Sequence, residues 1–213
     1  MNSYRDVFVY VEGPSDAEGL KVLFSRLRDE KRQRGVSIRF VPSQGKRNLL
    51  TRELHKAVNT VLNKSWAEVV LLPDLYPRNQ GFDHETPQEL FAGIDHRLRE
   101  ILSDKADPDT RVLQRIHSFC FKHDFESLLL AAPDALRTHL NTNSLDVNWV
   151  EPVEEQNHED PPKRVVERLF ESCGEKYVET EDAFEILATV DYRELAEACP
   201  QSFGPFVDYL EAL

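Results

Sequence analysis

The stretch that decides the fold is Phe8-Val9-Tyr10-Val11-Glu12-Gly13-Pro14-Ser15-Asp16. Four β-favouring residues end at a glutamate, a Gly-Pro turn follows, and Ser15 and Asp16 stand where a helix would begin. From Ala17 to Lys31 the apolar residues recur with helical spacing. This order predicts a strand, a turn and a helix.

Similar alternations follow in the next hundred residues. Further strands are expected over Val36–Val41, Ala67–Leu72 and Val112–Phe121, and further helices over Leu49–Leu62, Pro87–Ser103 and Asp124–Ala132. The apolar run of 67–72 is typical of a strand that is buried on both faces of a parallel sheet. The alternation of strands and helices predicts an α/β domain with a mostly parallel sheet flanked by helices.

The pattern changes after about Pro133. Asn141 to Asp160 is polar and acidic and is expected to form a loop. Short helices are expected over Val165–Glu171, Asp182–Leu187, Tyr192–Ala198 and Phe206–Leu213. We therefore expect an α/β core over residues 1–135 and a helical C-terminal extension over 136–213 that packs on it. A separate second domain is disfavoured, because so short a segment with a long loop buries little core.

The composition narrows the class of protein. Of 213 residues, 40% are hydrophobic and 30% charged, which is typical of a globular domain. No apolar run approaches the roughly 20 residues that span a bilayer, and Met1–Asp6 lacks the order of a signal peptide. We therefore expect a cytoplasmic protein without membrane contact. The 3 scattered cysteines do not predict a disulfide framework.

The net charge of −12 disfavours a protein that coats nucleic acid by itself, because such binding depends on phosphate neutralisation. It does not exclude a metal-dependent enzyme, because divalent ions offset clustered carboxylates. A basic partner subunit would also reduce the repulsion.

Acidic residues stand at the ends of three predicted strands. The first strand ends at Glu12, the third just before Asp74, and the fourth before Asp124 and Glu126. Parallel strands lie about 4.8 Å apart and ligands bind beyond their carboxyl ends, so these side chains can converge. Asp16 follows Glu12 by about one helical turn. Such an all-oxygen group favours Mg²⁺ or Mn²⁺ over zinc.

Several of these residues also fit an ordinary structural role. Acids at strand ends often cap helices, and Asp124 by itself fits such a cap better. His123 could activate water or be a buried, hydrogen-bonded histidine. His84 and Glu85 lie in a polar loop that could reach the site.

The basic candidates allow the same two interpretations. Gly45-Lys46-Arg47 could hold a phosphate at a helix start or be a solvated turn. Lys163 and Arg164 follow two prolines that could present them rigidly, or they could be surface charges at a helix start. Trp66 and Trp149 are isolated, and packing in the core or an interface is expected rather than base stacking.

The segment Val11-Glu12-Gly13-Pro14-Ser15-Asp16 resembles the Toprim domains of overcoming-lysogenization-defect (OLD) nucleases. That resemblance implies a compact Rossmann-like sheet and a Mg²⁺ site made by a strand-end Glu and an Asp-x-Asp motif. Here the second element is Asp74-Leu75-Tyr76, so a tyrosine replaces the second aspartate.

The chain more closely resembles a bacterial family of the Toprim clan, domain of unknown function 4276. The resemblance rests on four segments, which are Val11-Glu12-Gly13, Asp74-Leu75-Tyr76, the run from His123 to Leu129, and a tail with Pro162-Lys163-Arg164, Tyr177, Cys199-Pro200, Phe203 and Phe206. The tyrosine after Asp74 is usual there.

The resemblance implies Glu12, Asp16, Asp74 and Glu126 as ligands of Mg²⁺ or Mn²⁺. It also implies phosphodiester hydrolysis of nucleic acid and phosphate contacts from Lys163 and Arg164. Relatives often act in anti-phage defence beside an ABC- or AAA-type ATPase. The alternative is a non-catalytic binding or regulatory subunit of such a complex. The choice among DNA, RNA and tRNA, the number of ions and the oligomeric state stay open.

Overall fold

The computed structural model describes residues 4–105, 109–156 and 159–213. Two expectations extend outside these ranges. The expectation that Met1–Asp6 is no signal peptide includes residues 1–3, and the loop expected over Asn141–Asp160 includes residues 157 and 158. The sheet has four parallel strands in the order β2-β1-β3-β4. They are β1 (Arg5–Val11), β2 (Val36–Pro42), β3 (Ala67–Leu72) and β4 (Ile116–Ser118). The prediction of a parallel α/β domain is confirmed.

The helices of the first half are α1 (Pro14–Leu23), α2 (Ser25–Gln33), α3 (Lys46–Leu49), α4 (Arg52–Asn63) and α5 (Pro87–Ser103). Strand β3 shows why the sheet is covered on both faces. Val70 and Leu72 belong to the hydrophobic cluster that includes α1, whereas Val69 and Leu71 belong to the cluster that includes α4 and α5. Alternate residues of a strand point to opposite faces, so an unbroken apolar run fills both layers.

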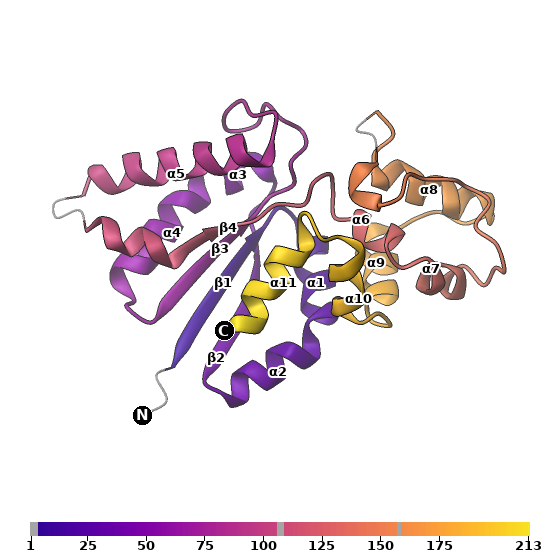
Figure 1. The fold of residues 1–213 in the computed structure, drawn as a ribbon, viewed down its shortest axis with the longest axis horizontal. Coiled ribbons are helices and arrows are strands. Elements are labelled where there is room, and N and C mark those ends of the chain that lie inside the picture. The colour runs from indigo at the N-terminus through magenta and orange to yellow at the C-terminus, as the bar shows by residue number, and fades with distance from the viewer. Residues whose placement is uncertain (1–3, 106–108, 157–158) are drawn as a thin grey trace.

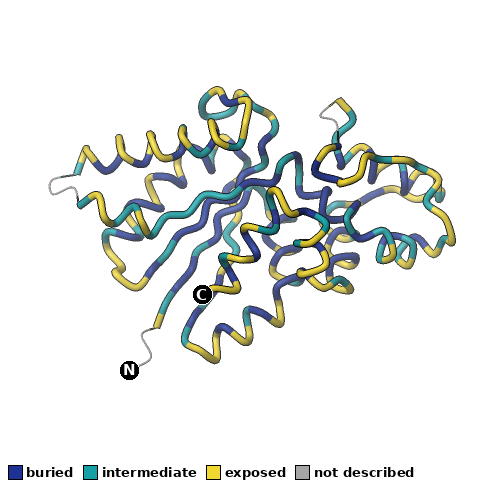
Figure 2. Tube along the Cα trace, viewed as in Figure 1, coloured by how far each residue is buried: buried dark blue, intermediate teal, exposed yellow. Residues whose placement is uncertain are grey.

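The second half contributes α6 (Ser127–Leu130), α7 (Pro133–His139), α8 (Pro162–Ser172), α9 (Glu179–Leu187), α10 (Tyr192–Ala198) and α11 (Phe203–Ala212). Two 3₁₀ turns are η1 (Thr110–Arg115) and η2 (Val153–Glu155). Figure 1 shows α11 lying against the sheet, while α6 to α9 group beyond the arrowheads of the strands. In Figure 2 the buried segments, in dark blue, lie next to one another where the two halves of the chain meet. Buried residues of both halves belong to one hydrophobic core cluster.

The helix expected over Ala17–Lys31 is broken at Phe24, which was not predicted. Phe24 is fully buried, and its ring lies 5.1–5.9 Å from those of four other aromatic residues, Phe40, Tyr192, Phe203 and Phe206. Turning the chain at this point places Phe24 in the core and sends α2 back along β2. The helix expected over Leu49–Leu62 is likewise divided, into α3 and α4.

The strand expected over Val112–Phe121 is wrong in its first half. The chain forms η1 there, and only Ile116–Ser118 pairs as β4, with an isolated bridge between Asp74 and Phe121. The Arg115 guanidinium donates to the carbonyls of Lys64 and Ala67, at 2.7 and 3.1 Å. These contacts attach the turn to the segment before β3.

The helix expected over Asp124–Ala132 is also shorter than predicted and is followed by a separate helix, α7, that begins at Pro133. A proline has no N–H and is favoured at the first helical position, so it starts a new helix instead of continuing the old one. None of the described helices combines the length and apolar character that a bilayer-crossing segment requires.

Candidate metal site at the strand ends

Glu12 and Asp74 come together because β1 and β3 are neighbours. Val11 pairs with Leu72, and each acid follows within two residues of its paired strand end. The Asp74 N–H donates to Glu12 Oε1 at 3.0 Å. The carbonyl of Glu12 accepts from the N–H of Gly45 at 2.7 Å, so the end of β1 is also attached to the turn before α3.

Asp16 occupies the first turn of α1 and is buried. Its Oδ2 accepts from the N–H of Gly13 at 2.8 Å. Gly13 is the residue that precedes the helix, so Asp16 caps the helix from inside the first turn. That bond orients the whole Asp16 carboxyl group.

Asp124 and Glu126 enter from the segment after β4. Glu126 is 3% exposed, and its Oε1 accepts from the Tyr177 hydroxyl at 3.4 Å and lies 3.3 Å from Lys163 Nζ. Asp124 was expected to fit a helix cap, but it does not cap α6, the helix that follows it in the chain. Its Oδ2 accepts instead from the Lys163 N–H at the start of α8, at 3.3 Å. The other oxygen, Oδ1, is buried without a hydrogen-bond partner among the described residues.

These five carboxylates, Glu12, Asp16, Asp74, Asp124 and Glu126, form one electrostatic group that we call the acidic cluster. Burial raises the pKa of Asp74 well above its usual value, and the other four carboxylates add to the shift. Negative charges that repel one another in a cluster favour the binding of a proton or a cation.

The other members of the acidic cluster show the same direction. Burial raises the pKa of Glu12 to about 7, although the Asp74 N–H and Lys46 oppose the shift. Burial raises the pKa of Asp16 and of Asp124 to about 6. Burial, reinforced by Asp124, raises the pKa of Glu126 to about 8, against the pull of Lys163.

Lys163 is the cation that contacts this cluster. Its ammonium lies between Glu126 and Glu179 and pairs with both. Burial lowers the pKa of Lys163, but Glu126 and Glu179 outweigh it, so the pKa is raised overall. The expected phosphate ligand is thus held at the cluster by two carboxylates. Its neighbour Arg164 is exposed and donates to the carbonyl of Glu159 at 3.3 Å.

Lys46 has a different environment from the one expected. It is 2% exposed, and its ammonium contacts the carbonyls of Leu75 and Pro77, each at 2.7 Å, and Nε2 of His84 at 3.1 Å. Burial lowers its pKa to about 8 while Glu12 opposes the shift. Its donors therefore hold the loop after β3, whereas Arg47 is exposed and open to a ligand.

His84, considered as a residue that could reach the site, is buried behind this loop. His123 is 7% exposed and stacks on Tyr76, with ring centroids 5.4 Å apart and an interplanar angle of 5°. The Arg78 guanidinium lies 4.5 Å from the centre of the Tyr76 ring. The tyrosine that replaces the second acid of Asp-x-Asp is therefore part of a packed aromatic contact.

The donor set fits a hard divalent ion, because it is made of carboxylate oxygens and one of them, Asp124 Oδ1, is buried without a partner among the described residues. No three His, Cys, Asp or Glu side chains in the described part of the chain already converge as metal ligands. An ion would therefore require some carboxylates to rotate.

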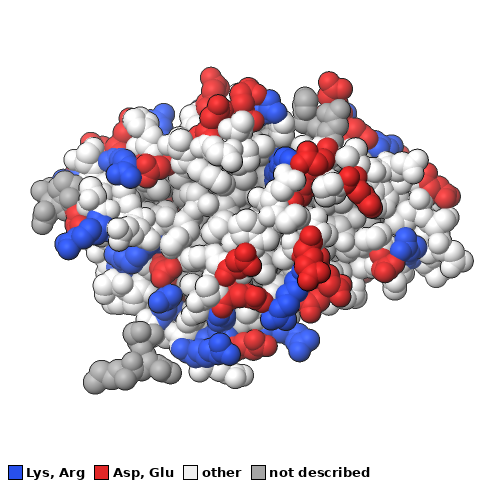
Figure 3. Space-filling model, viewed as in Figure 1, with Lys and Arg blue, Asp and Glu red and all other residues white. Residues whose placement is uncertain are grey.

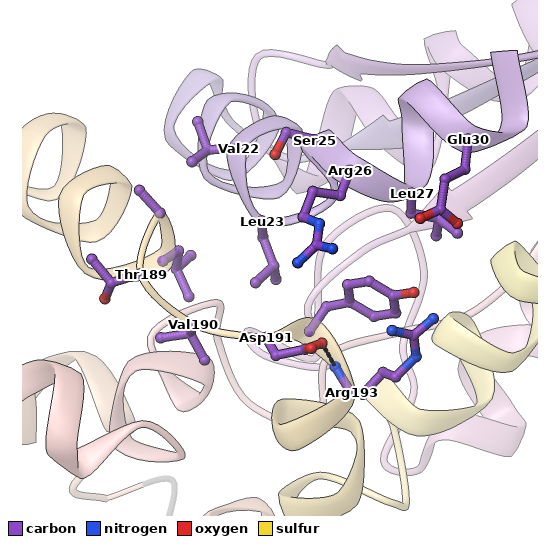
Figure 4. Close-up of a pocket in the computed structure, with 13 residues that line it drawn as sticks. Val22, Leu23, Ser25, Arg26, Leu27, Glu30, Thr189, Val190, Asp191 and Arg193 are labelled. Carbon is purple, nitrogen blue, oxygen red and sulfur yellow. Dashed lines mark hydrogen bonds between the residues drawn. The ribbon is translucent and has the colours of Figure 1, made fainter. Parts of the chain in front are cut away.

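A separate cavity of about 300 Å³ lies between α1–α2 and the segment from α9 to α10. Figure 4 shows Arg26 and Glu30 on one side and Asp191 and Arg193 on the other. None of the residues predicted for the functional site lines this cavity. It is therefore distinct from the acidic cluster.

Fold and site together define a parallel α/β domain with a group of carboxylates at the carboxyl ends of its strands. The chain belongs to the family described as Domain of unknown function (DUF4276), whose profile matches residues 11–211.

Among solved structures, the chain is similar to the C-terminal region of the Burkholderia pseudomallei OLD protein. The sequence identity is 16%, the TM-score is 0.48, and 98% of each chain is covered. Comparison with curated proteins finds no match.

Proposed function

We propose that this protein is a Mg²⁺- or Mn²⁺-dependent nuclease that hydrolyses phosphodiester bonds in DNA or RNA. One observation supports the proposal most directly. Asp74 lies among four other carboxylates, and burial together with their charges raises its pKa. Buried and half-buried carboxylates at such a density are stabilised by a divalent cation.

In this proposal Glu12, Asp16, Asp74 and Glu126 hold the ion, and we add Asp124 to them because its Oδ1 is buried without a partner among the described residues. A bound divalent ion supplies Lewis-acid stabilisation to the attacking and leaving oxygens of a phosphodiester. Glu12 is oriented by the Asp74 N–H, and Asp16 by the Gly13 N–H, so two ligands are positioned before an ion arrives.

The remaining predicted residues contribute contacts with substrate. In this proposal Lys163, which pairs with Glu126, binds a phosphate oxygen when that pairing loosens. Arg47 and Arg164 are exposed and contact the phosphate backbone of the nucleic acid. Lys46 positions the loop after Asp74. His123 is assigned the role of a base for water, next to Asp124 in the chain.

The cellular role belongs to the same proposal. An ABC- or AAA-type ATPase is the expected partner, and anti-phage defence the expected context. The family resemblance supports this, and the net charge of −12 fits a partner with a basic surface.

The experiment is a titration of Mg²⁺ and Mn²⁺ into the wild type and Asp74→Asn by calorimetry, followed by cleavage assays on labelled DNA, RNA and tRNA. The matched control is Asp134→Asn, because the Asp134 side chain is 92% exposed. We expect the wild type and the control to bind the ion and cleave, and Asp74→Asn to do neither. Absence of cleavage on every substrate, alone and with the ATPase, would refute the nuclease.

A non-catalytic binding subunit is the second candidate. This second candidate is favoured by Tyr76, which occupies the position of the second aspartate in the Asp-x-Asp motif of Toprim nucleases. Here the Tyr76 ring stacks on His123. In that case Glu12→Gln leaves partner binding and cellular protection intact. Loss of protection by a folded Glu12→Gln protein would exclude it.

A further inference from the structure

Two hollows meet at Tyr4, near the amino ends of the strands and so at the opposite edge of the sheet from the acidic cluster. The first, of about 490 Å³, is lined by Arg28, Arg32 and Arg39 together with Tyr4. Arg28 is held in place by its own hydrogen bonds, from Nε to the Ile38 carbonyl at 3.1 Å and from a terminal nitrogen to the Lys21 carbonyl.

The second hollow, of about 410 Å³, is lined by Arg5, Trp66 and Arg115, again with Tyr4. Arg115 donates to the carbonyls of Lys64 and Ala67, and the N–H of Ala67 in turn bonds to the Lys64 carbonyl. The turn that carries Trp66 is therefore fixed to the rest of the structure.

These hollows are basic although the protein is acidic. Five arginines line them against two carboxylates, Asp29 and Glu68, in a chain of net charge −12. Figure 3 shows basic side chains gathered along the lower edge of the molecule, where Figure 1 places α2. Burial lowers the pKa of Arg28, and neighbouring Arg32 adds to that effect. Two guanidiniums that repel one another favour an anion near them.

Two aromatic side chains lie exposed among these arginines. Tyr4 is 52% and Trp66 49% exposed, the highest values among the exposed large hydrophobic residues described. Of the two packing roles expected for Trp66, core or interface, the exposure excludes the core. The Trp66 carbonyl accepts from the Asp6 N–H at 3.2 Å, so its backbone is fixed to β1 while its side chain faces solvent.

We propose that this amino-end surface, defined by Tyr4, Arg28, Arg32, Trp66 and Arg115, binds single-stranded nucleic acid. Arg28 and Arg115, which are held by main-chain carbonyls, keep their charge for phosphates, and exposed aromatic rings stack on unpaired bases whatever their sequence. The surface lies about 20 Å from the acidic cluster, the length of a strand of 6 residues. It therefore anchors a separate segment of the strand, and it acts whether or not the acidic cluster cleaves.

The test is fluorescence anisotropy with a labelled single-stranded oligonucleotide of mixed sequence, in EDTA so that no cleavage occurs. We expect the wild type to bind and to weaken as salt increases. Trp66→Ala and Arg32→Glu should each weaken binding about tenfold, whereas Trp66→Phe keeps most of it because it retains a ring for stacking.

The controls match each change in type and exposure. Phe184→Ala removes an aromatic residue that is 41% exposed, and Arg97→Glu reverses an exposed charge on α5. Both should bind as the wild type does. Absence of binding in EDTA, or equal binding by Trp66→Ala and the wild type, would overturn the proposal. Equal affinity for a duplex of the same sequence would also overturn it. None of these results bears on metal binding at Asp74.

Discussion

At the scale of single residues, the main property of this protein is the electrostatic free energy needed to keep five carboxylates close together. A lone acid at a strand end is ordinary, but here burial raises the pKa of each carboxyl, and at Asp74 the other four carboxylates add to the shift. A proton or a divalent ion relieves the same repulsion, so the two compete for the cluster.

This competition predicts how stability depends on pH. A carboxyl whose pKa is raised in the folded state stabilises the protein below its unfolded pKa, and the contribution is lost as pH rises through the folded pKa. With folded values of about 6 to 8 for Asp16, Asp124, Glu12 and Glu126, the unfolding free energy in EDTA should fall from pH 5 to pH 8. Urea unfolding at several pH values between 5 and 8 measures this free energy.

The same experiment with Mn²⁺ is the complement. The ion should restore stability at pH 8 by about 2.7 kcal/mol at a hundredfold excess over Kd. Asp74→Asn should flatten the pH profile. Glu68, whose pKa is lowered to about 2 chiefly by the neighbouring His117, titrates below this window and does not disturb it. A metal-free profile that rises toward pH 8 would contradict the assignment.

Lys163 gives a second prediction at this scale. Lys163→Met removes the cation that pairs with Glu126 and Glu179. Its side chain is 42% exposed, so after solvent screening we expect a loss of about 1–2 kcal/mol in EDTA, largely recovered with Mn²⁺. The matched control is Lys21→Met, because Lys21 pairs with Glu18 on the surface and should matter little. Equal unfolding midpoints for the two variants would show that Lys163 does not neutralise the cluster.

At the scale of elements, α1 determines where Asp16 lies, and Gly19 determines how closely α1 can approach Phe125, which lies just before α6. A Cβ at Gly19 would lie 2.6 Å from the ring of buried Phe125. Gly19→Ala should therefore destabilise the protein by about 1–3 kcal/mol through overpacking, although alanine is the better helix former.

Thermal unfolding and metal titration of Gly19→Ala check this. Metal affinity should also fall, because α1 carries Asp16 away from the cluster when it shifts. Glu18→Ala, at the exposed neighbouring position, is the control. A more stable Gly19→Ala protein would mean that Phe125 moves aside without cost.

At the scale of the whole molecule, the last helix completes the core. Phe203 and Phe206 of α11 are buried, and both rings contact that of Phe24 between α1 and α2. The division into 1–135 and 136–213 stays a prediction, but the buried cluster draws residues from both segments.

Deletion of residues 203–213 should therefore expose Phe24 and leave a protein with helical far-ultraviolet circular dichroism but no fixed near-ultraviolet signal. Dye binding to exposed apolar surface would measure the same loss. Deletion of Leu213 alone is the control, since this residue is only partly buried. A native-like truncated protein would show that the sheet and α1–α5 fold without α11.

The sequence by itself determined the parallel α/β class and the acids at the strand ends. Apolar runs and turn residues act locally, and parallel strands necessarily bring their ends to one edge. It also indicated most C-terminal helices, with Tyr192–Ala198 found as predicted.

Only the tertiary structure decided which side chains face one another. It showed that Phe24 breaks a helix, that Lys46 is buried beneath a loop, and that Asp124 meets α8. It also placed Trp66 among arginines at the far edge of the sheet. These outcomes depend on contacts between residues far apart in the chain, and local pattern carries no information on the burial or charge that such contacts create.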